Sequence, residues 1–147
     1  MLRVTRLADY GIVMLTFLAT HPKNTYATRD IANASKLPLP IASKVLKQLG
    51  KAGLLVSRRG MRGGYGLARR PEEITIADVI RALEGPIALT KCSDAGRDCG
   101  LETDCPVRTN WHLINEAVHS ALGKINLAQM THPLQRDLAS SLFQQWG

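Results

Sequence analysis

The sequence predicts a mainly α-helical fold with one small β-hairpin, and three observations lead to that class. Apolar residues recur at intervals of three and four along most of the chain, which is the spacing of a helix face. The stretch 54–68 instead has two short apolar runs on either side of a glycine-rich tip, which is the pattern of a hairpin. The 147 residues, 45% of them hydrophobic, suffice for one good core or for a small domain with an assembly element.

The first helix is expected over residues 7–21, because one apolar stripe runs through this stretch and Pro22 follows it. The stripe consists of Leu7, Tyr10, Gly11, Met14, Leu15 and Leu18. Asp9 stands on the first turn with Arg3 and Arg6 nearby. By itself, Asp9 can be read as a carboxylate favoured at the positive end of a helix dipole, or as the partner of one of these arginines.

A helix-turn-helix is expected next. Thr28 is a good N-cap for a second helix that runs to about Lys36, and the prolines of residues 37–40 force a turn. Pro40 suits the first position of a third helix over residues 41–51. Five polar residues are expected on its outer face: Ser43, Lys44, Lys47, Gln48 and Lys51. Such a helix can enter the major groove of DNA, although the same pattern also fits an ordinary helix with a solvated lysine face.

The predicted hairpin favours the DNA interpretation. Residues 54–57 and 65–68 are expected to be strands, and Gly53 is suited to end the helix before them. Four glycines mark the tip, Gly60, Gly63, Gly64 and Gly66, and three arginines project from it, Arg58, Arg59 and Arg62. A basic hairpin after a helix-turn-helix is a wing, which lies along phosphates or probes the minor groove. A phosphate-binding P-loop is rejected, since its GKS or GKT ending is missing.

The second half of the chain is expected to form the dimer interface. Thr75 and Asp78 cap a short helix that ends at Gly85, and Pro106 opens a long helix. The apolar stripe of the long helix is Val107, Trp111, Ile114, Val118, Ala121, Leu122 and Ile125. This stripe can be covered only by another helix like itself, so a homodimer is expected, with two recognition helices about one DNA turn apart. Further on, Asn126 and Gln129 predict a cap, and Leu134, Leu138, Leu142 and Trp146 predict a short terminal helix.

Charge is distributed unevenly along the chain. Residues 1–70 contain thirteen Lys and Arg against two acidic residues, a balance of +11. Residues 71–147 contain six basic and ten acidic residues, a balance of −4. The first half is therefore expected to bind an anion, and double-stranded DNA is the expected partner.

All three cysteines, Cys92, Cys99 and Cys105, lie in the loop 91–106. An odd count in a chain with no expected signal peptide or membrane span indicates a reducing, cytoplasmic compartment. Zinc is a poor fit because its cysteines usually stand roughly two to four residues apart. The wider spacing suits an iron–sulfur cluster. The alternative, three buried apolar cysteines, conflicts with the charges in the loop: Asp94, Arg97, Asp98, Glu102 and Asp104.

Five features in this order, LADYGI, the helix-turn-helix, RGMRGGYGLA, VIRALEGPIAL and the cysteine loop, resemble the winged-helix regulators that include IscR, NsrR and the SUF-system regulators. The resemblance extends to about residue 130 and is closest to the SUF-system branch. It implies a homodimeric transcription factor, not an enzyme, in which three cysteines and a variable fourth ligand bind an iron–sulfur cluster. A 4Fe–4S cluster is favoured and a 2Fe–2S cluster is the alternative.

The fourth ligand is expected to be Asp9 of the second subunit, because Asp9 matches an NsrR-type ligand position in the resemblance. Arg108 stands where the IscR branch has a histidine ligand, and an arginine cannot bind iron. Glu102 and Asp104 remain alternative ligands, whereas His112 is expected to point away.

The expected division is a winged helix-turn-helix domain over 1–84, a cluster-binding loop over 85–106, and a dimerisation helix with a tail over 107–147. Expected DNA contacts are Thr28, Ser43, Lys44, Lys47, Gln48, Arg58, Arg59 and Arg62. A metal-free thiol sensor that regulates transcription is the first alternative function, and an iron–sulfur electron-transfer protein is the second.

Overall fold

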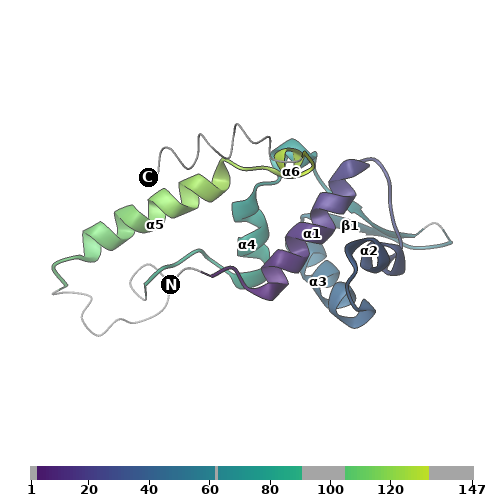
Figure 1. Cartoon of the computed structure of the whole chain (residues 1–147), viewed down its shortest axis with the longest axis horizontal. Helices are drawn as coiled ribbons and strands as arrows, with labels where there is room; N and C mark the ends of the chain where they lie inside the picture. The colour runs from purple at the N-terminus through teal and green to yellow at the C-terminus, as the bar shows by residue number, and fades with distance from the viewer. Residues whose placement is uncertain (1–2, 62, 91–104, 133–147) are drawn as a thin grey trace.

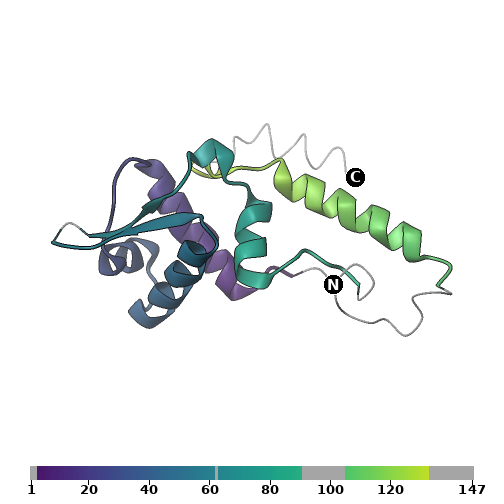
Figure 2. The same cartoon turned by 180° about the vertical axis from the view of Figure 1, so that it is seen from behind.

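The computed structural model describes residues 3–61, 63–90 and 105–132. Its helices are α1 (Arg6–Thr20), α2 (Thr28–Ser35), α3 (Leu39–Lys51), the 3-10 helix η1 (Pro71–Glu73), α4 (Ile76–Glu84), α5 (Arg108–Gly123) and α6 (Leu127–Met130). The strands β1 (Leu55–Arg58) and β2 (Gly64–Leu67) form one antiparallel hairpin. The mainly helical fold with a small hairpin is therefore confirmed. Figures 1 and 2 show the hairpin projecting on one side of the helices α1–α4 and α5 extending on the other.

The winged body is organised around α1. The Thr5 side chain caps this helix by accepting a hydrogen bond of 3.2 Å from the Ala8 amide. Met14, Leu15 and Leu18 of α1 are buried. They belong to one apolar core with buried residues of α2, α3, β1 and α4. Because each fully buried side chain of this size stabilises a fold by about 1.5–3 kcal/mol, this core holds α3 in place through its own packing.

The turn between α2 and α3 is as expected, but its boundaries differ. The expected N-cap Thr28 is wrong by one residue, since Ala27 occupies the cap position and makes no side-chain cap bond. Lys36 ends α2 with a left-handed φ of 55°, which lets the amide of the next residue, Leu37, bond back to the Ala32 carbonyl at 2.9 Å. Pro40 lies at the second rather than the first position of α3. Helix ends fray, so a boundary that differs by one or two residues is common.

The hairpin is fastened to the chain before α2. Its register pairs Leu55 with Leu67 and Arg58 with Gly64. Tyr65 exchanges two backbone hydrogen bonds with Tyr26, of 3.0 and 2.8 Å. Gly64, with φ +149°, packs directly on the Tyr26 backbone where no side chain would fit. The wing therefore has a fixed direction relative to α2.

Two capping boxes frame the second half of the fold. Thr75 and Asp78 form the expected box at the start of α4, and α4 ends before Gly85 as expected. Asn126 and Gln129 form the other expected box at α6. Between them α5 begins at Arg108, two residues later than expected, with no side-chain cap.

After α5 the chain returns to the winged body. The Ile125 carbonyl accepts from Ile76, the Leu127 amide donates to Ile74, and the Leu127 side chain is fully buried. The terminal helix expected from Leu134 to Trp146 lies outside the described residues. In the part of the chain that is described, no helix is long and apolar enough to cross a membrane.

Candidate nucleic-acid interface and sensor loop

The exposed face of α3 carries the expected positive charge. Lys44 and Lys47 are exposed, and Ser43 beside them is half-buried. The opposite face of α3 consists of completely buried side chains: Ala42, Val45, Leu46 and Leu49. The helix thus presents amines and a hydroxyl while its apolar face holds it to the body, which is the arrangement a recognition helix needs.

Gln48 departs from the expected outward face. Its Oε1 atom is buried and has no hydrogen-bond donor among the described residues. The residue stands three positions after the buried Val45, so it lies at the edge of the buried stripe. It lines a hollow of about 640 Å³ with residues that include Lys51 of α3 and Arg81 of α4. The side chain is directed toward α4 rather than fully into solvent.

The wing presents cations that have no acidic partner. Arg58 and Arg59 are exposed and form no ion pair within the described residues. Arg62 lies outside those residues. Thr28, at the first position of α2, is half-buried. Unpaired guanidinium groups remain available for phosphate oxygens, which they bind in bidentate fashion.

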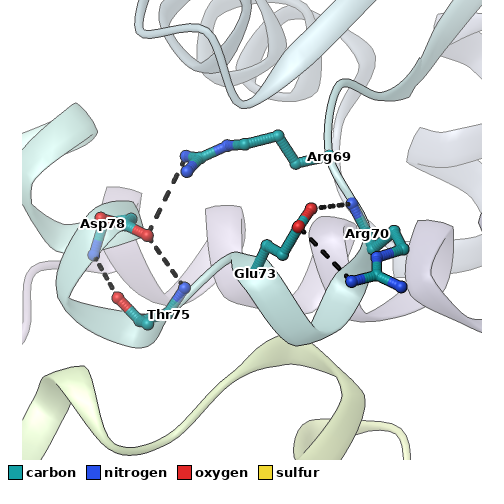
Figure 3. Close-up of polar contacts among 5 residues, drawn as sticks. All are labelled: Arg69, Arg70, Glu73, Thr75 and Asp78. Carbon is teal, nitrogen blue, oxygen red and sulfur yellow. Dashed lines mark hydrogen bonds and ion pairs between the residues drawn. The ribbon is translucent and has the colours of Figure 1, made fainter.

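The arginines at the root of the wing are held instead by carboxylates (Figure 3). Arg69 lies 4.0 Å from Asp78, and Arg70 lies 3.6 Å from Glu73. The same Asp78 oxygen also accepts from the Thr75 amide at 3.0 Å. Exposed pairs of this kind contribute little stability, about 0–1 kcal/mol. The first pair joins the exit of the hairpin to the start of α4 and the second joins it to η1, whereas Arg58 and Arg59 have no described acidic partner.

Only one of the three expected cysteine ligands can be placed. Cys105 is half-buried, is not in a disulfide among the described residues, and lies just before α5, where its carbonyl accepts from Arg108 at 3.3 Å. Cys92 and Cys99 lie outside the described residues, as do the alternative ligands Glu102 and Asp104. The described residues contain no group of three or more His, Cys, Asp or Glu that could hold a metal ion.

Asp9 has an exposed side chain on the first turn of α1. Among the described residues it forms no ion pair with Arg3 or Arg6, so the ion-pair interpretation is not supported. Figure 1 shows the start of α1 lying well apart from the start of α5 within one chain. Within the described residues the Asp9 carboxylate is therefore exposed and makes no ion pair.

Asn115 is a positioning residue that sequence reasoning missed. Its Oδ1 accepts from the Leu89 amide at 3.1 Å, and its Nδ2 donates to the Ile87 carbonyl at 3.0 Å. The segment that leads into the cysteine loop is thereby fixed to α5. The one available signal was a polar residue within an apolar stripe, next to Ile114.

The rest of α5 is joined to the body at few points. Arg81 of α4 contacts His119 through nitrogen atoms 2.7 Å apart. No residue of α5 is buried. The exposed fractions are 38% for Trp111, 67% for Leu113 and 45% for Ile114. A helix with this much exposed apolar surface is typical of one that packs against a partner.

Comparison with known proteins agrees with this architecture. The sequence model of the Rrf2 family, described as iron-dependent transcriptional regulators, matches residues 4–133. The NsrR transcriptional regulator of Geobacillus kaustophilus is 34% identical over 131 residues, which cover 88% of this chain and 89% of that protein.

Two solved structures extend the agreement to the fold. The structure of T. potens IscR superposes with a TM-score of 0.68 at 30% identity, covering 88% of this chain and 85% of that one. Staphylococcus aureus CymR, solved in an oxidized form, gives a TM-score of 0.67 at 25% identity, covering 91% and 99%. The family model and the NsrR relative are described as regulators of transcription, not enzymes. With its helix-turn-helix, its basic wing and a match over nearly its whole length, the chain belongs to the Rrf2 family of transcriptional regulators.

Proposed function

We propose that this regulator binds operator DNA as a homodimer and responds to the state of an iron–sulfur cluster held by Cys92, Cys99 and Cys105. The observation that carries the sensing part is the position of Cys105. Its thiol is half-buried and outside any described disulfide at the base of α5, where the three-cysteine motif ends. A cluster held here would lie next to α5, the helix to which dimerisation is assigned. The helix α4 contacts both α5 and the root of the wing. A regulator of transcription acts on DNA in the cytoplasm.

DNA contact is assigned to two surfaces. Lys44, Lys47 and Ser43 of α3 face the major groove, where the lysines neutralise phosphates and the serine reaches base edges. Arg58, Arg59 and Arg62 belong to the wing and bind phosphates or the minor groove, and Thr28 at the start of α2 contacts the backbone. Gln48 contributes to base readout only if its side chain turns out of the hollow beside α4.

The homodimer is assigned to α5. Trp111, Leu113 and Ile114 leave apolar surface exposed that the described part of the chain does not cover. A second copy of the same helix has the matching surface, and a two-fold axis through it would place two copies of α3 on one face of the DNA.

The donor set fits an iron–sulfur cluster. Cysteine thiolates are the usual ligands of such clusters, and the half-buried Cys105 can supply one of them. We assign the fourth position to Asp9 of the second subunit, because the exposed Asp9 carboxylate is unpaired among the described residues. When bound, the cluster supplies a group that oxygen or nitric oxide can attack, and a 4Fe–4S form is favoured over a 2Fe–2S form. In the Asp9→Ala protein, an unchanged cluster spectrum with an unchanged lifetime would overturn the Asp9 assignment.

A metal-free thiol sensor is the second candidate, favoured by the similarity to CymR, a relative that was solved in an oxidized form. Here oxidation would join two thiols of the loop in a disulfide, with hydrogen peroxide accepting the two electrons and leaving as water.

Anaerobic purification separates the two candidates. A brown protein with bound iron and acid-labile sulfide supports the cluster. A colourless protein that loses DNA binding on peroxide treatment and recovers it with dithiothreitol supports the thiol sensor. A protein that does neither would contradict both.

A further inference from the structure

Met61, at the end of the wing, is the most exposed large apolar residue in the described chain. Its exposed fraction is 107%, whereas that of Leu113, the next highest, is 67%. Leu113 lies on α5, the helix to which the dimer is assigned. Met61 lies away from that surface, on the hairpin, and its side chain is fully hydrated.

The backbone holds Met61 at the corner of a tight turn. The Gly63 amide donates to the Gly60 carbonyl at 2.9 Å, and Met61 directly follows Gly60. Gly60 has φ +110°, and a Cβ at Gly63 would lie 2.8 Å from the Gly60 carbonyl oxygen. The glycines on either side allow the backbone of the tip to approach itself closely. The Met61 side chain is left on the outside of this bend.

The charges around the tip indicate what it approaches. Arg58 and Arg59 are exposed, and no described carboxylate pairs with them. The root of the same hairpin is fastened by the pairs Arg69–Asp78 and Arg70–Glu73. A cationic hairpin with an apolar end matches a surface with anionic rims and an apolar interior. The minor groove of a DNA duplex is such a surface, with phosphates at its rims and sugars and base faces inside.

We propose that the Met61 side chain enters the minor groove and packs against sugars or a base step there, beyond the phosphate contacts of the arginines. This inference rests on the proposed DNA-binding function and deepens it. An unbranched, polarizable thioether adapts to a narrow gap, and apolar wedges of this kind open base steps and bend the duplex. Part of the binding energy then comes from apolar contact, which salt does not screen.

The test uses a duplex that the wild-type protein selects from a random DNA pool. Met61→Ala should weaken binding about five- to tenfold, because the apolar contact is lost. The slope of affinity against salt should stay unchanged, because no charge is removed. Met61→Gln should lose as much DNA affinity as Met61→Ala does, and the affinity of Met61→Leu should stay within about twofold of the wild type. Energy transfer between dyes at the duplex ends should report a smaller bend for the alanine and glutamine variants.

Val56→Ala is the matched control, since Val56 is an apolar residue with 45% exposure on β1 of the same hairpin. It should bind as wild type does. Alanine and glutamine variants of Met61 with wild-type affinity and bend would overturn the inference while leaving DNA binding intact. A wild-type protein that selects no duplex would instead overturn the proposed function, and this inference with it.

Discussion

The side-chain oxygen of Asn115 accepts a 3.1 Å hydrogen bond from the amide of Leu89, across 26 residues of chain. The same side chain donates to the Ile87 carbonyl. Leu89 stands three residues before Cys92, and Cys105 lies just before α5. Both ends of the cysteine loop are therefore attached to one helix, so we expect a change in the loop to act on the helix to which dimerisation is assigned.

Asn115→Leu should loosen this attachment. The change leaves the Leu89 amide and the Ile87 carbonyl without their partners, which costs about 1–3 kcal/mol locally. Hydrogen exchange of the Leu89 amide should accelerate by about tenfold or more. The absorbance of a reconstituted cluster should also decay severalfold faster in air. Asn110→Leu is the control, because Asn110 is an exposed residue near the start of the same helix. Equal exchange rates in the two variants would contradict the role given to Asn115.

Local signals in the sequence were sufficient for most of the fold. The capping boxes at Thr75 and Asn126 and the hairpin were predicted because each is specified by residues that are close in sequence. The roles of Gln48 and Asn115 were not, because each depends on a segment distant in the chain. Gln48 faces a hollow shared with α4, and Asn115 bonds to the backbone of residues 87–89. Cys92 and Cys99 lie outside the described residues, so their ligand role stays a prediction.

Gly64→Ala should destabilise the wing. A methyl group at this position would collide with the Tyr26 backbone, and φ +149° is unfavourable for alanine. Because backbone cannot move aside as a flexible side chain can, the loss in the free energy of unfolding should be about 2 kcal/mol or more. Thermal melting measures it. The matched control is Gly123→Ala, where the added carbon meets no other described part of the chain within 4 Å beyond its own helix backbone and chain neighbours. A Gly64→Ala protein as stable as the control would show that the hairpin is not fastened at Tyr26.

Arg59→Ala should weaken DNA binding on every sequence. One phosphate contact is lost, so the slope of log affinity against log salt should fall by about one unit. Arg70→Ala is the control, because Arg70 lies at the root of the wing and is already paired with Glu73. Titrations at several salt concentrations give both slopes. An unchanged salt slope for Arg59→Ala, or an equal decrease in slope for both variants, would contradict the assignment of phosphate contacts to the tip of the wing rather than to its root.

Ile114→Asp should separate the dimer. The substitution places a charge in the apolar stripe of α5, where burial against a second helix would strip it of water. Analytical ultracentrifugation should show a monomer that retains the helical circular dichroism of the wild type. Asn110→Asp puts the same charge at an exposed polar position of α5 and should remain dimeric. A dimeric Ile114→Asp protein would move the interface elsewhere.

Control of DNA binding by the cluster, as proposed above, can be measured in one titration. The affinity for the selected duplex is measured anaerobically with the cluster-loaded protein, then with the same sample after nitric oxide has destroyed the cluster, and with Cys105→Ala. We expect the affinity to change by at least about tenfold on cluster loss, equivalent to about 1.4 kcal/mol of coupling, and Cys105→Ala to bind like the cluster-free sample. Equal affinities in all three samples, each still a folded dimer, would contradict the proposal.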